Sequence, residues 1–213
     1  MADVDFFFDP ICPWAWITSR LTVEVAGQRD LAVDWRFICL RMVNEEKDYD
    51  RAFPPGYVHA HTAGQRMLRI AAAARRDVGN GAVGALYTAF GEQLHTGGRS
   101  EEIRDGDDSV IGEAVELAGL PVSLAAAGDD EDLDAVVREE TDLALARTGK
   151  DVGTPIITFA PGTEREASLF GPVIARIPRG EEALRIWDAF ELLARTAGFA
   201  ELKRSARDRP TYS

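Results

Sequence analysis

The sequence predicts an α/β fold in which a strand–helix–strand unit and a strand–strand–helix unit flank an all-helical segment. Short runs of apolar, β-branched and aromatic residues occur near both ends of the 213-residue chain, as expected for buried strands. The middle of the chain, from about residue 57 to residue 148, shows helical spacing and no convincing strand pattern. Strands that are separated by helices in this order are typical of α/β domains.

The N-terminal part predicts the strand–helix–strand unit. Val4–Phe8 is an apolar run bounded by Asp-Pro, which is typical of a buried strand. Apolar residues recur at helical spacing from Pro13 to about Ala26, and Gly27 is the expected end of that helix. Leu31–Leu40 predicts the second strand, reached by a right-handed crossover.

The remaining elements follow along the chain. Two short strand patterns, Val152–Phe159 and Ala167–Pro172, are joined by a turn sequence and predict a hairpin, and a helix is expected from about Glu181 to Thr196. We therefore expect a domain made of residues 1–56 and 149–213 with a helical insertion at residues 57–148. The four helices expected in the insertion are Ala60–Arg76, Ala82–Leu94, Asp108–Ala118 and Asp130–Thr148.

Charge and composition exclude several classes of protein. The formal net charge of −12 disfavours nucleic acids and anionic membranes as partners, because both bind clustered Lys and Arg. The N-terminus does not resemble a secretory signal, and no stretch has the length of a membrane span, so the expected location is the cytoplasm. The two cysteines lack zinc-ligand spacing, and no metal site or structural disulfide is expected.

Cys12 is the candidate nucleophile. It stands where the N-cap of the first helix is predicted, with Pro13 at the first helical position. A sulfur in this position faces backbone N–H groups and the positive end of the helix dipole, and both favour the thiolate. Position alone also allows a small buried hydrophobe, as cysteines outside disulfides often are.

Thr154-Pro155 strengthens the reactive interpretation. This X-Pro pair opens a strand directly after the helical segment, and in a fold of this plan the loop lies beside the start of the first helix. A cis peptide bond there would expose backbone polar groups next to the sulfur.

At this point the chain resembles a known family. The element order, with Cys-Pro-Trp at the first helix and Gly-Thr-Pro before the third strand, looks like the DsbA-like branch of the thioredoxin superfamily. The stretches "DPICPWAWITSRL", "GTPIITF", "FGPVIARIPRGEEA" and "ELKR" resemble the mycothiol-dependent nitroreductases and disulfide reductases of actinobacteria over nearly the whole chain. The resemblance implies a thioredoxin fold, Cys12 as the catalytic nucleophile, mycothiol as co-substrate with no tightly bound cofactor, and a thiol-binding site made of Pro13, Trp14, Trp16, Thr154 and Pro155.

Ala15 departs from the family pattern. Dithiol members carry a resolving cysteine at this position, so this chain cannot form an active-site disulfide through it. A monothiol enzyme needs a second small thiol to release its mixed disulfide, so the predicted activity is thiol–disulfide exchange on small molecules or thiolated proteins. The sequence leaves open whether Ala15 is natural or engineered, and whether nitroreduction survives without the second cysteine.

Two other functions stay open at this level. One is a thiol-dependent isomerase or transferase of the kappa-class type, which activates a bound thiol and forms no protein adduct, and the other is a redox-inactive binding paralogue. Cys39 lies among apolar residues and is expected in the core, while His95 is expected to cap carbonyls or touch the edge of the site. The physiological substrate and the oligomeric state are not predicted.

Overall fold

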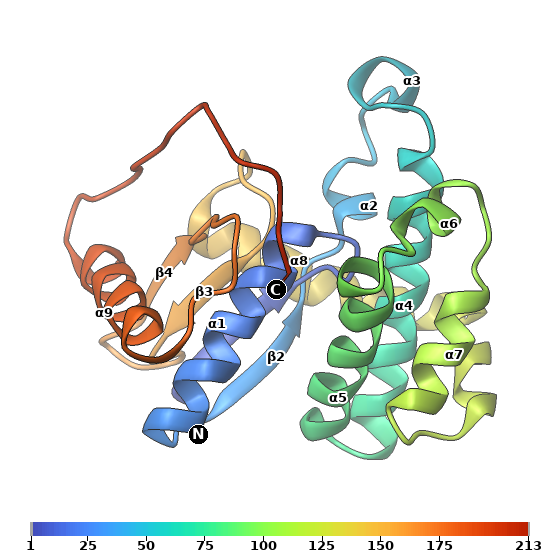
Figure 1. Ribbon diagram of the computed structural model, residues 1–213, viewed down its shortest axis with the longest axis horizontal. Helices are drawn as coiled ribbons and strands as arrows, with labels where there is room; N and C mark the ends of the chain where they lie inside the picture. Colours follow the sequence, from blue (N-terminus) through green and yellow to red (C-terminus); the bar gives the residue numbers. More distant parts are fainter. Residues whose placement is uncertain (1, 213) are drawn as a thin grey trace. The chain divides into compact units, whose positions relative to one another are not determined.

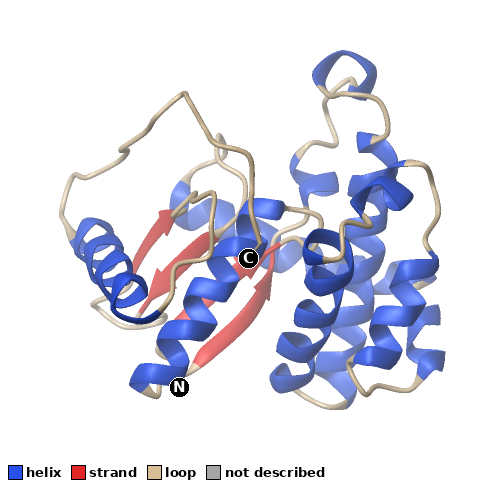
Figure 2. Cartoon of the chain, viewed as in Figure 1, coloured by secondary structure: helices blue, strands red, loops and turns tan. Residues whose placement is uncertain are grey.

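The computed structural model describes residues 2–212, and these divide into two compact units. The first contains residues up to 8, 12–36 and 144 onward, and the second contains residues 9–11 and 37–143. Figure 1 labels the elements and Figure 2 separates helices from strands. Apart from Phe37 at the end of β2, the strands of the described sheet belong to the first unit, so the second is helical, as the pattern of residues 57–148 predicts.

The first unit has the predicted thioredoxin fold. Its four-stranded sheet has the order β2-β1-β3-β4, with β1 at Val4–Phe8, β2 at Val33–Phe37, β3 at Ile156–Phe159 and β4 at Ala167–Phe170. β3 runs antiparallel to both β1 and β4, which confirms the predicted hairpin. Helices α1 (Pro13–Arg29) and α9 (Gly180–Arg195) pack against each other (Figure 1).

Aromatic side chains fill the core of this unit. Phe6 and Trp35 meet edge to face with ring centres 5.3 Å apart, and Phe159 and Trp187 do so at 5.4 Å. Such pairs add about 0.5–1.5 kcal/mol to the stabilisation that comes from burial alone. The rigid sheet fixes the two loops that hold the candidate site.

The helical unit is built around α4 (Tyr57–Asp77). The other elements of this region are α2 (Leu40–Val43), α3 (Tyr49–Ala52), α5 (Asn80–Gly91), a π-helical turn η1 (Glu92–Thr96), α6 (Ser100–Arg104), α7 (Ser109–Leu117), the 3₁₀ segments η2 (Val122–Asp129) and η3 (Glu131–Leu133), and α8 (Asp134–Thr148), whose last turn from Ala144 belongs to the first unit. Residues 37–56, which the sequence groups with the first domain, pack in the helical unit. They do so because aromatic side chains of α3 and the following loop contact α4, as in the edge-to-face pair of Tyr49 and His61 at 5.6 Å.

Several predicted ends were wrong. α1 continues through Gly27 to Arg29 and ends where Asp30 adopts a left-handed conformation with φ 52°. A glycine inside a helix costs only about 0.5–1 kcal/mol relative to alanine, which tertiary packing overrides. The second strand is shorter than predicted because Cys39 caps α2, and α8 starts at Asp134 instead of Asp130, after a 3₁₀ turn.

Candidate active site around Cys12

Cys12 lies in the loop between β1 and α1. Its backbone is extended, with φ −79° and ψ 113°, and it is the N-cap of α1 with Pro13 at the first helical position, as predicted. The Cys12 carbonyl oxygen accepts the first helical hydrogen bond, from Trp16 N at 3.1 Å. Proline fits here because the first turn of a helix does not need its N–H.

The Cys12 side chain points to the loop that precedes β3. Its Sγ donates a hydrogen bond to the Thr154 carbonyl oxygen over 3.4 Å, and Cys12 is only 7 % exposed. Thr154 is fixed in turn, because its hydroxyl donates to the Phe7 carbonyl oxygen at 3.0 Å. The Thr154–Pro155 peptide bond is cis, and the Pro155 carbonyl oxygen accepts a hydrogen bond from Gly171 N at 2.8 Å.

This contact differs from the arrangement that the sequence suggested. The sequence predicted that the sulfur faces N–H groups of the first turn, but the Cys12 side chain makes no capping hydrogen bond to α1. A carbonyl oxygen accepts from S–H and repels a thiolate, whereas the helix dipole favours the thiolate. The two influences on Cys12 therefore oppose each other in this conformation.

The two tryptophans of the motif have different surroundings. Trp14 is half-buried, and the Arg207 guanidinium carbon lies 5.9 Å from its ring centre. Trp16 is only 2 % exposed and stacks beneath Arg20, whose guanidinium carbon is 4.1 Å from the ring centre. The structure thus brings Cys12, Pro13, Trp14, Thr154 and Pro155 together in one unit and places the Trp16 side chain in its core.

Ala15 is completely buried at the third position after Cys12. Its methyl group stands where a dithiol enzyme would carry the second sulfur. No described residue forms a disulfide, and Cys39 is fully buried in the helical unit. Burial raises the pKa of the Cys39 thiol to about 12, as expected for a core cysteine.

Two buried titratable side chains hold residues 9–11, which precede Cys12. The Asp9 carboxylate accepts hydrogen bonds from Ile11 N at 3.1 Å and Leu40 N at 2.7 Å, and its burial raises its pKa to about 6. His95 Nε2 lies 2.9 Å from the Pro10 carbonyl oxygen, and burial lowers the pKa of His95 to about 4. Because a carbonyl can only accept, the neutral His95 ring carries its proton on Nε2.

Sequence reasoning missed Asp9, and it expected His95 to cap carbonyls at the end of its helix or to touch the edge of the site, whereas its ring bonds to the carbonyl oxygen of Pro10, between β1 and α1. The signal available for Asp9 was an acidic residue placed directly after a buried strand and before proline. His59 and His61 lie two positions apart in α4, but His59 is exposed while His61 is buried, and His61 Nδ1 lies 2.9 Å from the Tyr49 hydroxyl. No group of three or more His, Cys, Asp or Glu side chains within residues 2–212 is arranged to hold a metal ion.

Comparison with known proteins supplies the family. Residues 11–204 match the model of the Rv2466c-like family, described as mycothiol-dependent nitroreductase Rv2466c. The chain belongs to this family. The Rv2466c-like family carries the name of an oxidoreductase, which agrees with the thiol site described above.

Two individual proteins are similar to this Rv2466c-like chain. The uncharacterized protein Rv2286c of Mycobacterium tuberculosis is 30% identical over 209 residues, which covers 96% of this chain and 82% of Rv2286c. A crystal structure of a candidate protein-disulfide isomerase from Pseudomonas syringae has 18% identity and a TM-score of 0.46, and covers 75% of this chain and 84% of its own. In the described part of this chain, no helix is both long enough and apolar enough to cross a membrane.

Proposed function

We propose that this protein is a cytoplasmic thiol–disulfide oxidoreductase that works by a monothiol mechanism with mycothiol as co-substrate. The observation that carries the proposal is the position of Cys12, at the N-cap of α1 and 3.4 Å from the Thr154 carbonyl oxygen, with Ala15 in place of a second cysteine. A helix N-terminus lowers the pKa of a cysteine and makes it a nucleophile. The family name supports mycothiol as the small thiol.

The first step is attack by the Cys12 thiolate on a disulfide between mycothiol and a substrate. The new bond joins Cys12 Sγ to the mycothiol sulfur, the old S–S bond breaks, and the substrate leaves as a thiolate that takes up a proton. The Cys12 proton must leave before attack, because Sγ donates it to the Thr154 carbonyl in the resting site. Access to Cys12 requires a small displacement, since the residue is almost fully buried.

The second step is release of Cys12 by a second mycothiol. Its thiolate attacks the mycothiol sulfur bound to Cys12, so that oxidised mycothiol leaves and the Cys12 thiolate is restored. The second mycothiol supplies the electrons that reduce the substrate disulfide. The dependence on a second small thiol follows from Ala15, which offers no sulfur for internal attack.

Intact-mass spectrometry tests this cycle directly. The reduced protein is incubated with oxidised mycothiol, alongside Cys12→Ser and Cys39→Ala variants. We expect a mycothiol adduct on the wild type and on Cys39→Ala, none on Cys12→Ser, and removal of the adduct by reduced mycothiol. An adduct that never forms, or that reduced mycothiol does not remove, would refute redox turnover and leave the isomerase and binding functions to be tested.

An Ala15→Cys variant provides the matched comparison. It places a sulfur at the position of the missing resolving cysteine without changing Cys12. We expect this variant to lose its mycothiol adduct without added thiol and to gain an internal disulfide instead. Persistence of the adduct in Ala15→Cys would show that position 15 does not decide between the two mechanisms.

A further inference from the structure

Thr18 is a buried polar residue of α1 that the proposed mechanism does not use. It lies in the second turn of the helix, is completely buried, and donates its hydroxyl hydrogen to the Pro172 carbonyl oxygen at 2.7 Å. Threonine hydroxyls inside helices commonly bond to the carbonyl four residues earlier, as Thr22 Oγ1 does to the Thr18 carbonyl oxygen at 3.0 Å. Thr18 instead bonds to a segment 154 positions away, so its hydroxyl links α1 to another part of the unit.

The segment that receives this bond is joined to the loop that contacts Cys12. Gly171, next to Pro172, donates its N–H to the Pro155 carbonyl oxygen at 2.8 Å. Pro155 follows Thr154, whose carbonyl oxygen accepts the hydrogen bond from Cys12 Sγ. A path of three hydrogen bonds thus runs from the second turn of α1, through this segment and the loop, back to the sulfur at the start of α1.

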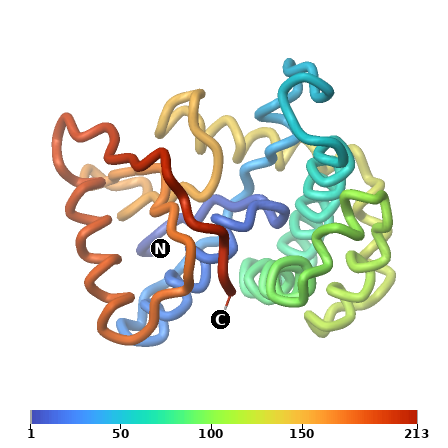
Figure 3. Tube along the Cα trace, turned by 45° about the horizontal axis from the view of Figure 1, so that its top comes forward, coloured from blue at the N-terminus to red at the C-terminus, as the bar shows by residue number. Residues whose placement is uncertain are grey.

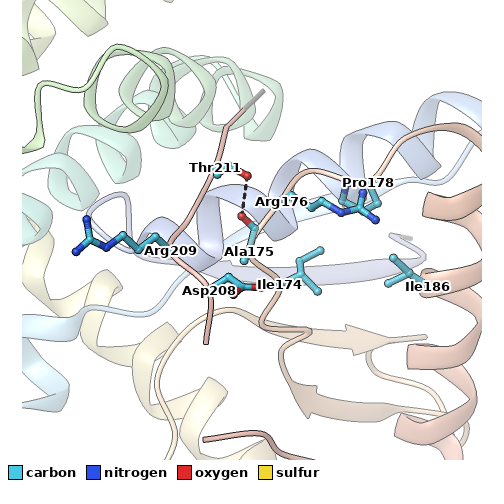
Figure 4. Close-up of a pocket in the computed structure, with 8 residues that line it drawn as sticks. All are labelled: Ile174, Ala175, Arg176, Pro178, Ile186, Asp208, Arg209 and Thr211. Carbon is cyan, nitrogen blue, oxygen red and sulfur yellow. Dashed lines mark hydrogen bonds between the residues drawn. The ribbon is translucent and has the colours of Figure 1, made fainter. Parts of the chain in front are cut away.

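On its other side the segment is attached less firmly. The C-terminal tail returns past it (Figure 3), and Thr211 N and Oγ1 donate to the Ala175 carbonyl oxygen at 2.7 and 3.2 Å. A pocket of about 400 Å³ lies between residues 174–178 and this tail, whose residues 208, 209 and 211 are exposed (Figure 4). Water can replace the partners of exposed groups but not those of buried ones. The buried Thr18 hydroxyl is therefore the firmer of the two attachments.

The position of the Thr154 carbonyl affects the protonation of Cys12. A carbonyl oxygen accepts from S–H and repels a thiolate, so its approach to Sγ favours the thiol. Two hydrogen bonds hold the loop that carries this carbonyl. One runs from the Thr154 hydroxyl to the Phe7 carbonyl oxygen at 3.0 Å, and the other joins Gly171 to Pro155. A displacement of Gly171 therefore weakens the contact between the carbonyl and the sulfur.

We propose that Thr18 is a positioning residue that holds the Thr154 carbonyl against the Cys12 sulfur through its bond to Pro172. The proposal rests on the proposed function, because it concerns the thiol that begins the exchange cycle. While the Thr18 bond is intact, the carbonyl favours the resting thiol. When the bond is lost, the segment moves away and the thiolate becomes more populated at a given pH.

Three substitutions of Thr18 separate its hydroxyl from its shape. Thr18→Val places a methyl group where the hydroxyl stands, 2.7 Å from the Pro172 carbonyl oxygen. Carbon does not approach oxygen this closely, since even C–H···O contacts are about 3.3–3.6 Å long, so the segment must move away. Thr18→Ala removes the hydroxyl without this contact, and Thr18→Ser keeps a hydroxyl.

The assay measures the rate of Cys12 alkylation by iodoacetamide as a function of pH, and it needs no mycothiol. It is carried out in the Cys39→Ala background, so that Cys12 is the one thiol of the chain, and the product is detected by intact mass. Thr22→Val is the matched control, because Thr22 is an equally buried threonine of α1 whose hydroxyl bonds within the helix. Urea unfolding of the same variants reports the stability lost with each buried hydroxyl.

We expect the pH midpoint of alkylation to fall by about half a pH unit in Thr18→Val, which is about a threefold faster reaction at a pH below the midpoint. Thr18→Ala should shift it in the same direction and decides the test alone if Thr18→Val does not fold. Thr18→Ser and Thr22→Val should keep the wild-type midpoint, although Thr22→Val loses stability. An unchanged or raised midpoint in Thr18→Ala, or an equal fall in Thr22→Val, would overturn the proposal.

The alkylation assay and the mass experiment with mycothiol fail independently. A midpoint lowered by Thr18→Ala without any mycothiol adduct on Cys12 would refute the monothiol cycle and keep the positioning role. A mycothiol adduct together with a midpoint that Thr18→Ala leaves unchanged would keep the cycle and refute the positioning role.

Discussion

Acid should destabilise this protein through two buried histidines. His61 and His95 are 4% and 5% exposed, and burial lowers the pKa of each to about 4. Arg41 and Lys47 also lower the pKa of His61 by their positive charges. Both rings are therefore neutral in the folded protein at pH 5, while in the unfolded chain they are protonated below about pH 6.5.

The size of the effect follows from linkage between protonation and unfolding. Because each folded pKa is below the unfolded one, the unfolded state binds more protons and the free energy of unfolding falls as the pH falls from about 6.5 to about 4. Through each histidine, the free energy of unfolding falls by about 2 kcal/mol by pH 5 and by about 3.4 kcal/mol once the pH is below 4.

Asp9 acts in the opposite direction. Its folded pKa of about 6 is above the ordinary value of 3.8, so its contribution to stability is present at low pH and lost as the pH rises through 6. Acidification from pH 7 to pH 5 therefore raises the contribution of Asp9 to the free energy of unfolding by about 1 kcal/mol. The net loss over this interval is therefore about 2–3 kcal/mol, which is a large share of the roughly 5–15 kcal/mol that stabilises a typical domain.

Urea unfolding of His95→Gln between pH 7 and pH 5 isolates one of these contributions. Glutamine keeps an N–H donor for the Pro10 carbonyl but does not titrate, so the loss of stability on acidification should shrink by about 2 kcal/mol. His59→Gln is the matched control, because it makes the same substitution at an exposed histidine of the same chain. The chain has only these three histidines, so NMR can follow each imidazole separately.

The reasoning would be refuted by either of two results. One is an unfolding free energy of His95→Gln that falls with pH as steeply as that of the wild type. The other is titration of the His61 and His95 rings near pH 6.5 in the folded protein.

Three further predictions concern packing and buried polar groups. Gly64→Ala would place a methyl group 2.6 Å from Asp9 Oδ1 and 2.9 Å from Ile11 Cγ1. We therefore expect thermal or urea unfolding to show a free energy of unfolding that is lower by about 1–3 kcal/mol. Gly81→Ala is the control, because its added methyl group would have nothing within 4 Å and should be neutral or stabilising. Glu140→Ala removes the buried carboxylate that accepts from Phe37 N at 2.9 Å and from Arg75 at 2.8 Å, and should cost about 3–5 kcal/mol, in contrast to Ala at the exposed Glu139. Cys39 should not react with an aromatic disulfide reagent at pH 8 in the folded protein, because its thiol pKa is raised to about 12. The Cys12→Ser variant, in which Cys39 is the remaining thiol, should therefore stay unmodified. Modification of Cys12→Ser as rapid as that of Cys39→Ala would contradict this expectation.

Local sequence signals predicted the elements that carry the site. The apolar run of Val4–Phe8 and the Cys-Pro pair located the end of β1 and the start of α1, because strand burial and the tolerance for proline at a helix start depend on neighbouring residues. The hairpin of β3 and β4 was visible for the same reason. The end of α1 was missed because tertiary packing decides whether a helix continues through a glycine.

The partners of the site residues were not visible in the sequence. His95 is 85 positions from Pro10, and the contact between Cys12 and Thr154 spans 142 positions. The direction of the Cys12 Sγ hydrogen bond depends on how the loop before β3 approaches Cys12, and no local sequence pattern encodes that approach. The pocket between residues 174–178 and the tail arises in the same way, from two segments whose sequences carry no binding motif.

The hydrogen bond from Cys12 to Thr154 bears on how long the protein survives oxidants. Peroxide attacks thiolates and converts them first to sulfenic acid, which a neighbouring thiol can rescue by forming a disulfide. With Ala15 at the position of that neighbour, an oxidised Cys12 would advance to the irreversible sulfinic acid unless a small thiol arrived first. Cys12 Sγ is almost fully buried against the Thr154 carbonyl oxygen, which limits the access of peroxide, so the resting site shelters the one sulfur for which position 15 offers no repair.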